Sequence, residues 1–289
     1  MTNIFKIDII KEIKKYGILI SIAKTIKSLG IRLETYIKKK RYSKVKTNFI
    51  VNVDDDKFIM SFLDYEIDNT IQQRIDGVRE PETTSIIKCL IRPGDQILEI
   101  GGCYGYFTML MANAVTSKGK VVSIEGLPNN FKILQNNIKL NKFENIDLYN
   151  YFIGGERGDQ NNKIEFGKND THPYFGIDKF KKKTNDELKK KETIVVECID
   201  IPNFLDKIQF KPTHIFMDIE GFEVNAIEQL CDKYLDIYSP TLVFEHHEMF
   251  YENGKGIEYI RDLLISKKYT VRKVYGNLIA FKNQIYNLN

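Results

Sequence analysis

A glycine-rich turn begins the part of the sequence with the clearest chemical meaning. Gly101-Gly102-Cys103-Tyr104-Gly105 joins an apolar run to a helical pattern, and glycines let the backbone turn tightly and approach a ligand. Glu125 ends the next apolar run, 24 residues beyond Gly101. If the two runs are adjacent parallel strands, the Glu125 carboxylate lies beside the turn and can accept hydrogen bonds from both hydroxyls of a ribose. The spacing therefore predicts a nucleoside site.

Two cofactors that contain a nucleoside compete for such a site. A dinucleotide such as NAD is normally bound by G-x-G-x-x-G, with its pyrophosphate at a helix N-terminus. Here the order is G-G-x-x-G, and Glu99 stands two positions before the first glycine. That carboxylate would repel a pyrophosphate, whereas it would help to hold the cationic methionine end of S-adenosylmethionine, directly or through water. The pattern favours S-adenosylmethionine, with an NAD-dependent oxidoreductase as the alternative.

A second group of acidic residues follows a predicted strand at 213–219. Asp218 lies near the end of that strand, and Glu220 and Glu223 come next. Ligands of open parallel sheets bind outside the carboxyl ends of strands, so Asp218 and Glu220 are expected to face the methyl group or its acceptor. Crowded carboxylates raise one another's pKa, which can make one of them a general base. The alternatives are that Glu220 caps the next helix and that Glu223 is part of its solvated first turn.

Polar residues also follow the apolar run at 241–245. Glu245, His246 and His247 stand at its end, and the chain has only four histidines. A histidine there could act as a base or, with Glu245 and Asp218, as a metal ligand, although a surface position is the usual alternative. We predict the catalytic residues Asp218, Glu220, Glu245 and His246. A divalent metal stays open but is not predicted.

The elements that must position these residues form an alternating pattern from about residue 80 onward. Short apolar strands at 96–100, 119–124, about 147–153, 194–199 and 213–219 alternate with helical segments such as 106–115. This order is typical of an α/β fold with a mostly parallel, doubly wound, Rossmann-like sheet.

Several motifs in this order resemble the FkbM-type methyltransferases, over about residues 78–250. The strand and turn at 97–106 are similar to the family's D-x-G-A-N-x-G-x segment, and Leu134 to Asn141 resembles its L-x-x-N-x-x-x-N helix. Residues 216–223 look like its K-I-D-V-E-G-x-E segment, and 240–245 like its P-x-x-x-x-E strand. The resemblance implies the class I methyltransferase fold, S-adenosylmethionine, and hydroxyl acceptors on sugars, glycolipids or other metabolites. It places the cofactor against Glu99, Gly101, Gly102, Cys103, Tyr104, Gly105, Tyr106, Glu125, Gly126 and Asp218.

Four departures from the family pattern leave these carboxylates in place. Glu99 replaces an aspartate, Gly102 and Cys103 replace Ala-Asn, and Gly126 replaces a proline. Met217 replaces a lysine, which removes any role for a cation at that position. A rival hypothesis is therefore a scaffold protein that has kept the fold and lost the reaction.

Charge is distributed unevenly along the 289 residues. Residues 1–46 hold 13 Lys or Arg against 3 Asp or Glu, although the net charge of the whole chain is only +4. We predict a basic amphipathic helical segment at 1–50 and a methyltransferase domain at 51–289, with its core at about 78–285 and a polar insertion at about 160–192. The basic segment would pack on the domain or on a second subunit of a homodimer, or lie on an anionic membrane surface.

Other function classes find little support in the sequence. The basic stretch has no interleaved aromatic platform and no DNA-reading motif, so nucleic acid is not an expected partner. No apolar run is long enough to span a membrane. Four cysteines without CxxC spacing indicate neither a zinc site nor a disulfide framework. The expected setting is cytoplasmic, with contact at the inner membrane face left open, and the expected partner is a small-molecule or glycan acceptor.

Overall fold

The computed structural model describes residues 48–63, 65, 67–153, 163–167, 193–232, 234–247 and 255–282. The predicted basic segment lies outside these residues except for its last three positions, and the predicted polar insertion lies outside them except for 163–167. Both stay predictions. Within the described part of the chain, no helix has the length and apolar character of a membrane span.

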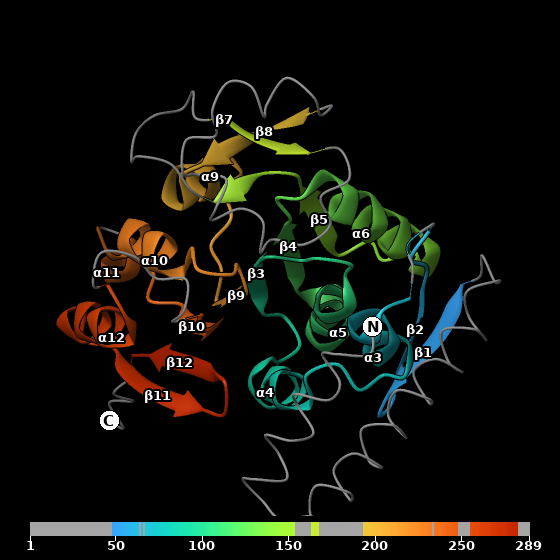
Figure 1. Cartoon of the computed structure of the whole chain (residues 1–289). Coiled ribbons are helices and arrows are strands. Elements are labelled where there is room, and N and C mark those ends of the chain that lie inside the picture. The colour runs from blue at the N-terminus through green and yellow to red at the C-terminus, as the bar shows by residue number, and fades with distance from the viewer. Residues whose placement is uncertain are drawn as a thin grey trace, which may run out of the picture.

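A seven-stranded sheet forms the centre of the molecule (Figure 1). Its strand order is β11-β12-β10-β9-β3-β4-β5. The five strands from β10 to β5 are parallel, and β12 runs antiparallel to both of its neighbours. The strands are β3 (Gln96–Ile100), β4 (Lys120–Ile124), β5 (Ile146–Tyr149), β9 (His214–Met217), β10 (Thr241–Glu245), β11 (Thr270–Val274) and β12 (Asn277–Phe281). The predicted mostly parallel, doubly wound sheet is confirmed.

The strand order reverses beside the central strand. From β3 the chain passes to β4 and β5 on one side, and it then crosses back to β9 and β10 on the other. Ile100 at the end of β3 is paired with Ile124 of β4 and with Met217 of β9. Ligands bind at such a reversal because the loops that leave adjacent strands diverge there. The glycine turn and Asp218 both lie at this point.

Helices cover both faces of the sheet (Figure 1). One face carries α4 (Pro81–Leu90), α5 (Tyr106–Val115) and α6 (Pro128–Asn141). The other carries α9 (Ile201–Lys207), α10 (Glu223–Asp232), α11 (Tyr234–Ile237) and α12 (Ile257–Ser266). Strand alternation divides the sheet between two apolar cores, since Ile215 and Met217 pack with α9 to α12 whereas Phe216 packs with α4 to α6.

A strand pair and a helix before residue 78 also belong to the second core. They are β1 (Phe49–Val53), β2 (Asp56–Met60) and α3 (Asn69–Ile75). Val51, Phe58 and Ile71 are buried there. The predicted segment boundary at residue 50 thus falls inside β1, and packed structure begins well before the expected core start near 78.

Two asparagines of α6 attach the β1–β2 hairpin to the rest of the molecule. The Asn137 side chain is fully buried, accepts a hydrogen bond from Ser61 N at 2.8 Å and donates to the Tyr104 carbonyl at 2.9 Å. Asn141 exchanges two hydrogen bonds of 2.7 Å with the backbone of Ile59. The asparagines of the L-x-x-N-x-x-x-N motif therefore connect the helix, the hairpin and the glycine turn.

One predicted strand, at about 147–153, is two strands. β5 ends at Tyr149 in the large sheet, and β6 (Phe152–Ile153) joins a small second sheet with β8 (Thr193–Ile199) and β7 (Lys163–Gly167). Asn150 lies between them and donates to the Glu125 carbonyl at 2.7 Å. The break brings Tyr151 and Phe152 to the edge of the site described next.

Candidate active site

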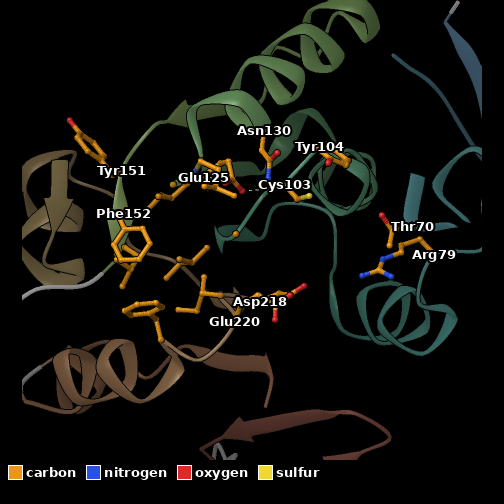
Figure 2. A pocket seen from close by; sticks show the side chains of 18 of the residues that line it. Thr70, Arg79, Cys103, Tyr104, Glu125, Asn130, Tyr151, Phe152, Asp218 and Glu220 are labelled. Atoms are coloured by element: carbon orange, nitrogen blue, oxygen red, sulfur yellow. Dashed lines mark hydrogen bonds between the residues drawn. The ribbon is translucent and has the colours of Figure 1, made fainter. Parts of the chain in front are cut away.

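A cavity of about 190 Å³ opens at the carboxyl ends of β3, β4 and β9 (Figure 2). The turns after β3, β4 and β9 contribute Gly101, Glu125 and Asp218 to its lining. Its remaining wall holds aromatic and apolar side chains, together with two arginines that precede the sheet. These are Leu127, Tyr151, Phe152, Phe222, Arg74 and Arg79.

The glycine turn follows β3 in a left-handed conformation that only glycine adopts easily. Gly101 has φ +97°, and a Cβ atom there would stand 2.0 Å from the Asp218 carbonyl oxygen. Gly101 N and Gly102 N both donate to the Ile124 carbonyl, at 2.8 and 3.1 Å. The turn is thus fixed to the end of β4, with its backbone facing the cavity.

Glu125 occupies the position that the sequence predicts. Its carboxylate accepts hydrogen bonds from Cys103 N and Leu127 N, both at 2.7 Å, and lines the cavity (Figure 2). Burial raises the pKa of Glu125 to about 7, although those two backbone donors act in the opposite direction. Each oxygen keeps a further lone pair, so the carboxylate can still accept hydrogen bonds from a ligand.

Six of the ten residues predicted to bind the cofactor line the cavity. They are Gly101, Cys103, Tyr104, Glu125, Gly126 and Asp218. Gly102 and Gly105 shape the turn from behind, since a Cβ atom at either would approach the side chain of Leu134. The remaining two, Glu99 and Tyr106, do not line it, although Glu99 lines the smaller cavity described below.

Glu99 lies behind the turn. Its buried carboxylate accepts hydrogen bonds of 2.5 Å from the hydroxyls of Thr108 and Ser123, and burial raises its pKa to about 7. Tyr106 is a core residue, with its ring edge-on to Phe58 and Phe107. Neither side chain lines the large cavity, so a direct contact of Glu99 or Tyr106 with the cofactor stays a prediction.

Asp218 stands between this cavity and a smaller one of about 40 Å³. The smaller cavity has a mostly apolar lining, which includes Phe107, Met111 and Val243, and its other polar side chains are those of Glu80, Thr83, Glu99, Glu245 and Asn277. Burial and the nearby carboxylates of Glu245 and Glu80 raise the pKa of Asp218 well above its usual range, against the opposing effect of His247. The pKa of Glu220 and that of Glu245 are raised as well, chiefly by burial. The predicted carboxylates Asp218, Glu220 and Glu245 are thus brought together.

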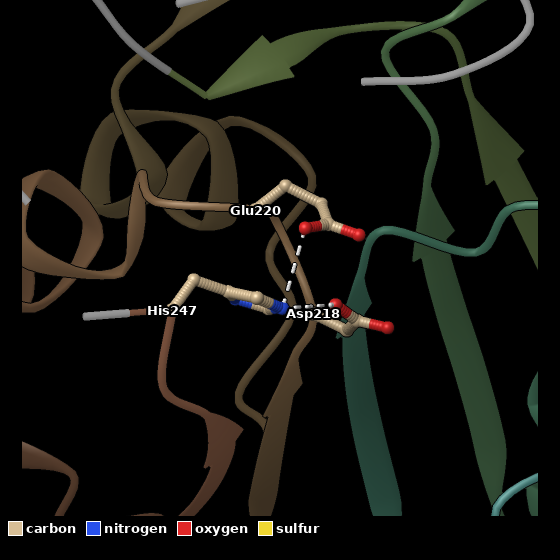
Figure 3. Close-up of side chains that lie close together, drawn as sticks. All are labelled: Asp218, Glu220 and His247. Atoms are coloured by element: carbon tan, nitrogen blue, oxygen red, sulfur yellow. Dashed lines mark ion pairs between the residues drawn. The ribbon is translucent and has the colours of Figure 1, made fainter. Parts of the chain in front are cut away.

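The His247 ring points toward the carboxylates of Asp218 and Glu220 (Figure 3) and also approaches those of Glu223 and Glu245. Its Nδ1 is 2.9 Å from Glu223 Oε1, and its Nε2 lies 3.4 Å from Glu220 Oε2, 3.7 Å from Asp218 Oδ1 and 4.0 Å from Glu245 Oε2. Burial lowers its pKa, but the hydrogen bond to Glu223 and the surrounding charges prevail and raise it to about 9. At neutral pH the side chain is therefore an imidazolium.

Glu223 is fully buried, which corrects the alternative of a solvated helix turn. It accepts hydrogen bonds from Ile219 N at 3.2 Å and Gly221 N at 3.0 Å, so it holds the loop that carries Asp218 and Glu220. Glu220 itself adopts a left-handed conformation, with φ +51°. Such strained backbone occurs often at functional sites.

The choice of His246 as the catalytic histidine is not supported. Its Nδ1 lies 3.0 Å from the Gly276 carbonyl, and its Nε2 faces Lys273. Glu245 and His247 are two residues apart, so they share one side of an extended chain whereas His246 faces the other. Strand alternation could have identified His247 from the sequence.

The same side chains contain two sets of donor atoms with metal-like spacing. Asp218, Glu220 and His247 form one set, and Glu80, Asp218 and Glu245 form the other, with donor atoms within 4.8 Å of one another. The imidazolium form of His247 has no lone pair for a metal, so an ion at the first set would have to displace a proton. A divalent metal at this cluster therefore stays open.

Four polar residues of the site belong to no motif that sequence analysis identifies. Arg74, Arg79 and Glu80 precede the glycine turn in a region without a local motif, and Arg79 pairs with Glu80. Asn130 is 3% exposed and lines the cavity, and its Oδ1 has no hydrogen-bond partner in the described part of the chain. Figure 2 shows Asn130 close to Glu125 and Cys103.

Comparisons with known proteins identify the sequence family. The family described as the methyltransferase FkbM domain matches residues 99–272. No curated protein matches the sequence. Among solved structures, precorrin-6y C5,15-methyltransferase from Geobacter metallireducens GS-15 is similar, with 12% identity, a TM-score of 0.45, and coverage of 80% of this chain and 97% of that one. An O-methyltransferase from Bacillus cereus in complex with SAH shows 14% identity, a TM-score of 0.41, and coverage of 70% and 82%.

Proposed function

Because the chain belongs to the FkbM methyltransferase family, we propose that it transfers a methyl group from S-adenosylmethionine to a hydroxyl group, with Asp218 as the general base. The preferred acceptor is a sugar hydroxyl on a glycan or glycolipid precursor. The observation that carries the proposal is the position of Asp218, which lines both the large cavity and the small one.

The large cavity has the chemistry that the methyl donor requires. Glu125 suits the ribose, and the apolar and aromatic wall formed by Leu127, Tyr151 and Phe152 suits the adenine. The orphaned Oδ1 of Asn130 offers a buried acceptor for a ribose hydroxyl or an amino group. Asp218 and Glu220 add negative charge that favours a sulfonium cation.

S-adenosylmethionine supplies a methyl group on positively charged sulfur, and the chain aligns the acceptor and takes up one proton. Methyl transfer is an in-line displacement, so much of the rate comes from the orientation of the two reactants. Burial and the nearby carboxylates raise the pKa of Asp218, and a carboxylate with a raised pKa is a better proton acceptor. His247, protonated at neutral pH, cannot accept that proton; it holds Glu220 and Asp218 in place.

The small cavity is the proposed entrance for the acceptor. Thr83 and Asn277 place hydroxyl and amide groups there, and they are joined by a hydrogen bond of 3.0 Å. Such groups form hydrogen bonds with the hydroxyls of a sugar, and a purely apolar lining would leave those sugar hydroxyls without partners.

The direct test measures transfer of a labelled methyl group to a panel of methyl glycosides and nucleotide-activated sugars. We expect Asp218→Asn to lower kcat by about 100- to 10,000-fold, because the amide cannot accept a proton, while S-adenosylhomocysteine still binds. Transfer that is equally fast in Asp218→Asn would contradict the role of Asp218. Tight cofactor binding without turnover on any acceptor would instead support the scaffold hypothesis.

A further inference from the structure

Arg74 is a buried cation that lines the donor cavity. It lies in the last turn of α3 and is 7% exposed. Its Nη1 donates to the Thr70 carbonyl at 3.0 Å, its Nη2 lies 3.7 Å from Cys103 Sγ, and its guanidinium stands 5.2 Å from the centre of the Tyr104 ring. These contacts fix the position of the guanidinium without neutralising its charge.

No carboxylate among the described residues lies within ion-pair distance of Arg74. The other arginine of the cavity differs, because Arg79 is paired with Glu80. A buried charge without a counter-ion is costly, and the free energy is recovered only when an opposite charge arrives. The guanidinium also has N–H groups left to donate, in a planar fork that suits a carboxylate.

The position of Arg74 relative to Glu125 indicates which carboxylate it would bind. Cys103 lies between them, since its backbone N–H donates to Glu125 and its Sγ faces Arg74. Burial raises the pKa of the Cys103 thiol to about 12 despite the nearby guanidinium, so the thiol is neutral and supplies no counter-charge. A ligand with its ribose on Glu125 would thus extend past Cys103 toward Arg74.

We propose that Arg74 binds the α-carboxylate of the methionine arm of the methyl donor. The inference rests on the proposed function, since it assumes that S-adenosylmethionine occupies the large cavity. It extends the donor site to α3, which precedes the segment matched by the family. Glu125 at the ribose and Arg74 at the carboxylate then hold the donor on either side of the reactive sulfur.

The test compares two ligands that differ only beyond the sulfur. S-adenosylhomocysteine carries the amino-acid arm, whereas 5′-methylthioadenosine lacks it. Calorimetric titrations would use the full chain, Arg74→Met, Arg74→Lys, and Arg272→Ala as a control at an exposed arginine. The methionine variant keeps the apolar stem against Tyr104, and thermal melts verify that each variant is folded.

We expect Arg74→Met to weaken S-adenosylhomocysteine by about 10- to 100-fold, which is the usual contribution of a hydrogen bond to a charged group. The affinity of Arg74→Met for 5′-methylthioadenosine should stay within about twofold of wild type. The affinity of Arg74→Lys for S-adenosylhomocysteine should fall between those of wild type and Arg74→Met. An equal loss of affinity for both ligands would mean that Arg74 only shapes the turn, and it would overturn the proposal. Unchanged affinity for both ligands would overturn it as well. If wild-type protein binds neither ligand, the proposed function fails as well.

Discussion

The positive charge of His247 offsets the mutual repulsion of the acidic residues in the site. Among the described residues, four carboxylates approach its ring, from Asp218, Glu220, Glu223 and Glu245. An imidazolium reduces their mutual repulsion, whereas a neutral ring would leave them crowded in a site with little water. His247 therefore stabilises this network of carboxylates through its positive charge.

This charge makes stability depend on pH. The folded-state pKa of His247 is about 9, above its ordinary value of 6.5, so its stabilising contribution is complete below pH 6.5 and is lost as the pH rises through 9. We expect His247→Gln to lower the free energy of unfolding by on the order of 2 kcal/mol at pH 6 and by much less at pH 9.5. Urea denaturation of both proteins at several pH values measures the difference. A difference that is constant from pH 6 to 9.5 would show that the ring is not charged.

At the scale of elements, the turn after β3 depends on close contact with the loop after β9. Gly101 N is bonded to the end of β4, and its Cα faces the Asp218 carbonyl. The loops that carry the donor site and the proposed base are therefore fixed against each other. A side chain at this point would separate them.

We expect Gly101→Ala to destabilise the protein by at least about 2 kcal/mol, through its positive φ and the clash with Asp218. Thermal unfolding measures this loss, and S-adenosylhomocysteine binding should weaken in parallel. Gly276→Ala is the matched control, because no atom lies within 4 Å of the position of a new Cβ there. Equal melting temperatures for the two variants would contradict the close contact at Gly101.

Helix α6 supports the same turn from the opposite side. Removing the Asn137 side chain leaves both Ser61 N and the Tyr104 carbonyl without their partner. We expect Asn137→Ala to cost about 2–4 kcal/mol of unfolding free energy, measured by denaturant titration. Asn136→Ala, one position away on the same helix, should change it by less than about 0.5 kcal/mol. Similar effects at both positions would contradict the role assigned to Asn137.

Local sequence pattern is sufficient to predict the strands and helices whose own residues mark where they begin and end. β3 and α5 begin and end where the sequence predicts, because a buried strand, a glycine turn and an apolar helix succeed one another without ambiguity. The sequence predicts a single strand at 147–153 because both halves of this segment are apolar. Only the strand pairing in the folded chain separates β5 from β6. A sequence window contains no information on which sheet a strand joins.

Part of the site could not be predicted for a similar reason. Glu125 and Asp218 follow strands whose ends meet at one edge, so sheet topology alone places them together. Arg74, Arg79 and Glu80 reach the cavity through the packing of α3 and α4, which no spacing along the chain reveals. His246 and His247 follow the same strand, and only the alternation of side chains, which puts His247 on the side of Glu245, distinguishes them.

For the molecule as a whole, the reversal of strand order places the donor cavity and the carboxylate cluster beside each other. The walls of the large cavity come from both sides of the sheet, with α3 and the segment before α4 on one side and the loop before α10 on the other. The carboxyl groups of Glu125, Asp218 and Glu220 lie on its lining, and Arg74 is the unpaired cation among the described residues of that lining. This distribution suits a ligand with a cationic centre and one terminal carboxylate.

The measurement that tests the central claim most directly is calorimetric titration with S-adenosylhomocysteine, run beside NAD. We predict that wild-type protein binds S-adenosylhomocysteine and not NAD. Glu125→Gln should weaken that binding by about tenfold or more, since an amide cannot accept the same hydrogen bonds from a ribose. Glu144→Gln, at an exposed position, should not. Absence of binding, binding of NAD instead, or an affinity that is unchanged in Glu125→Gln would contradict the donor site described for this chain.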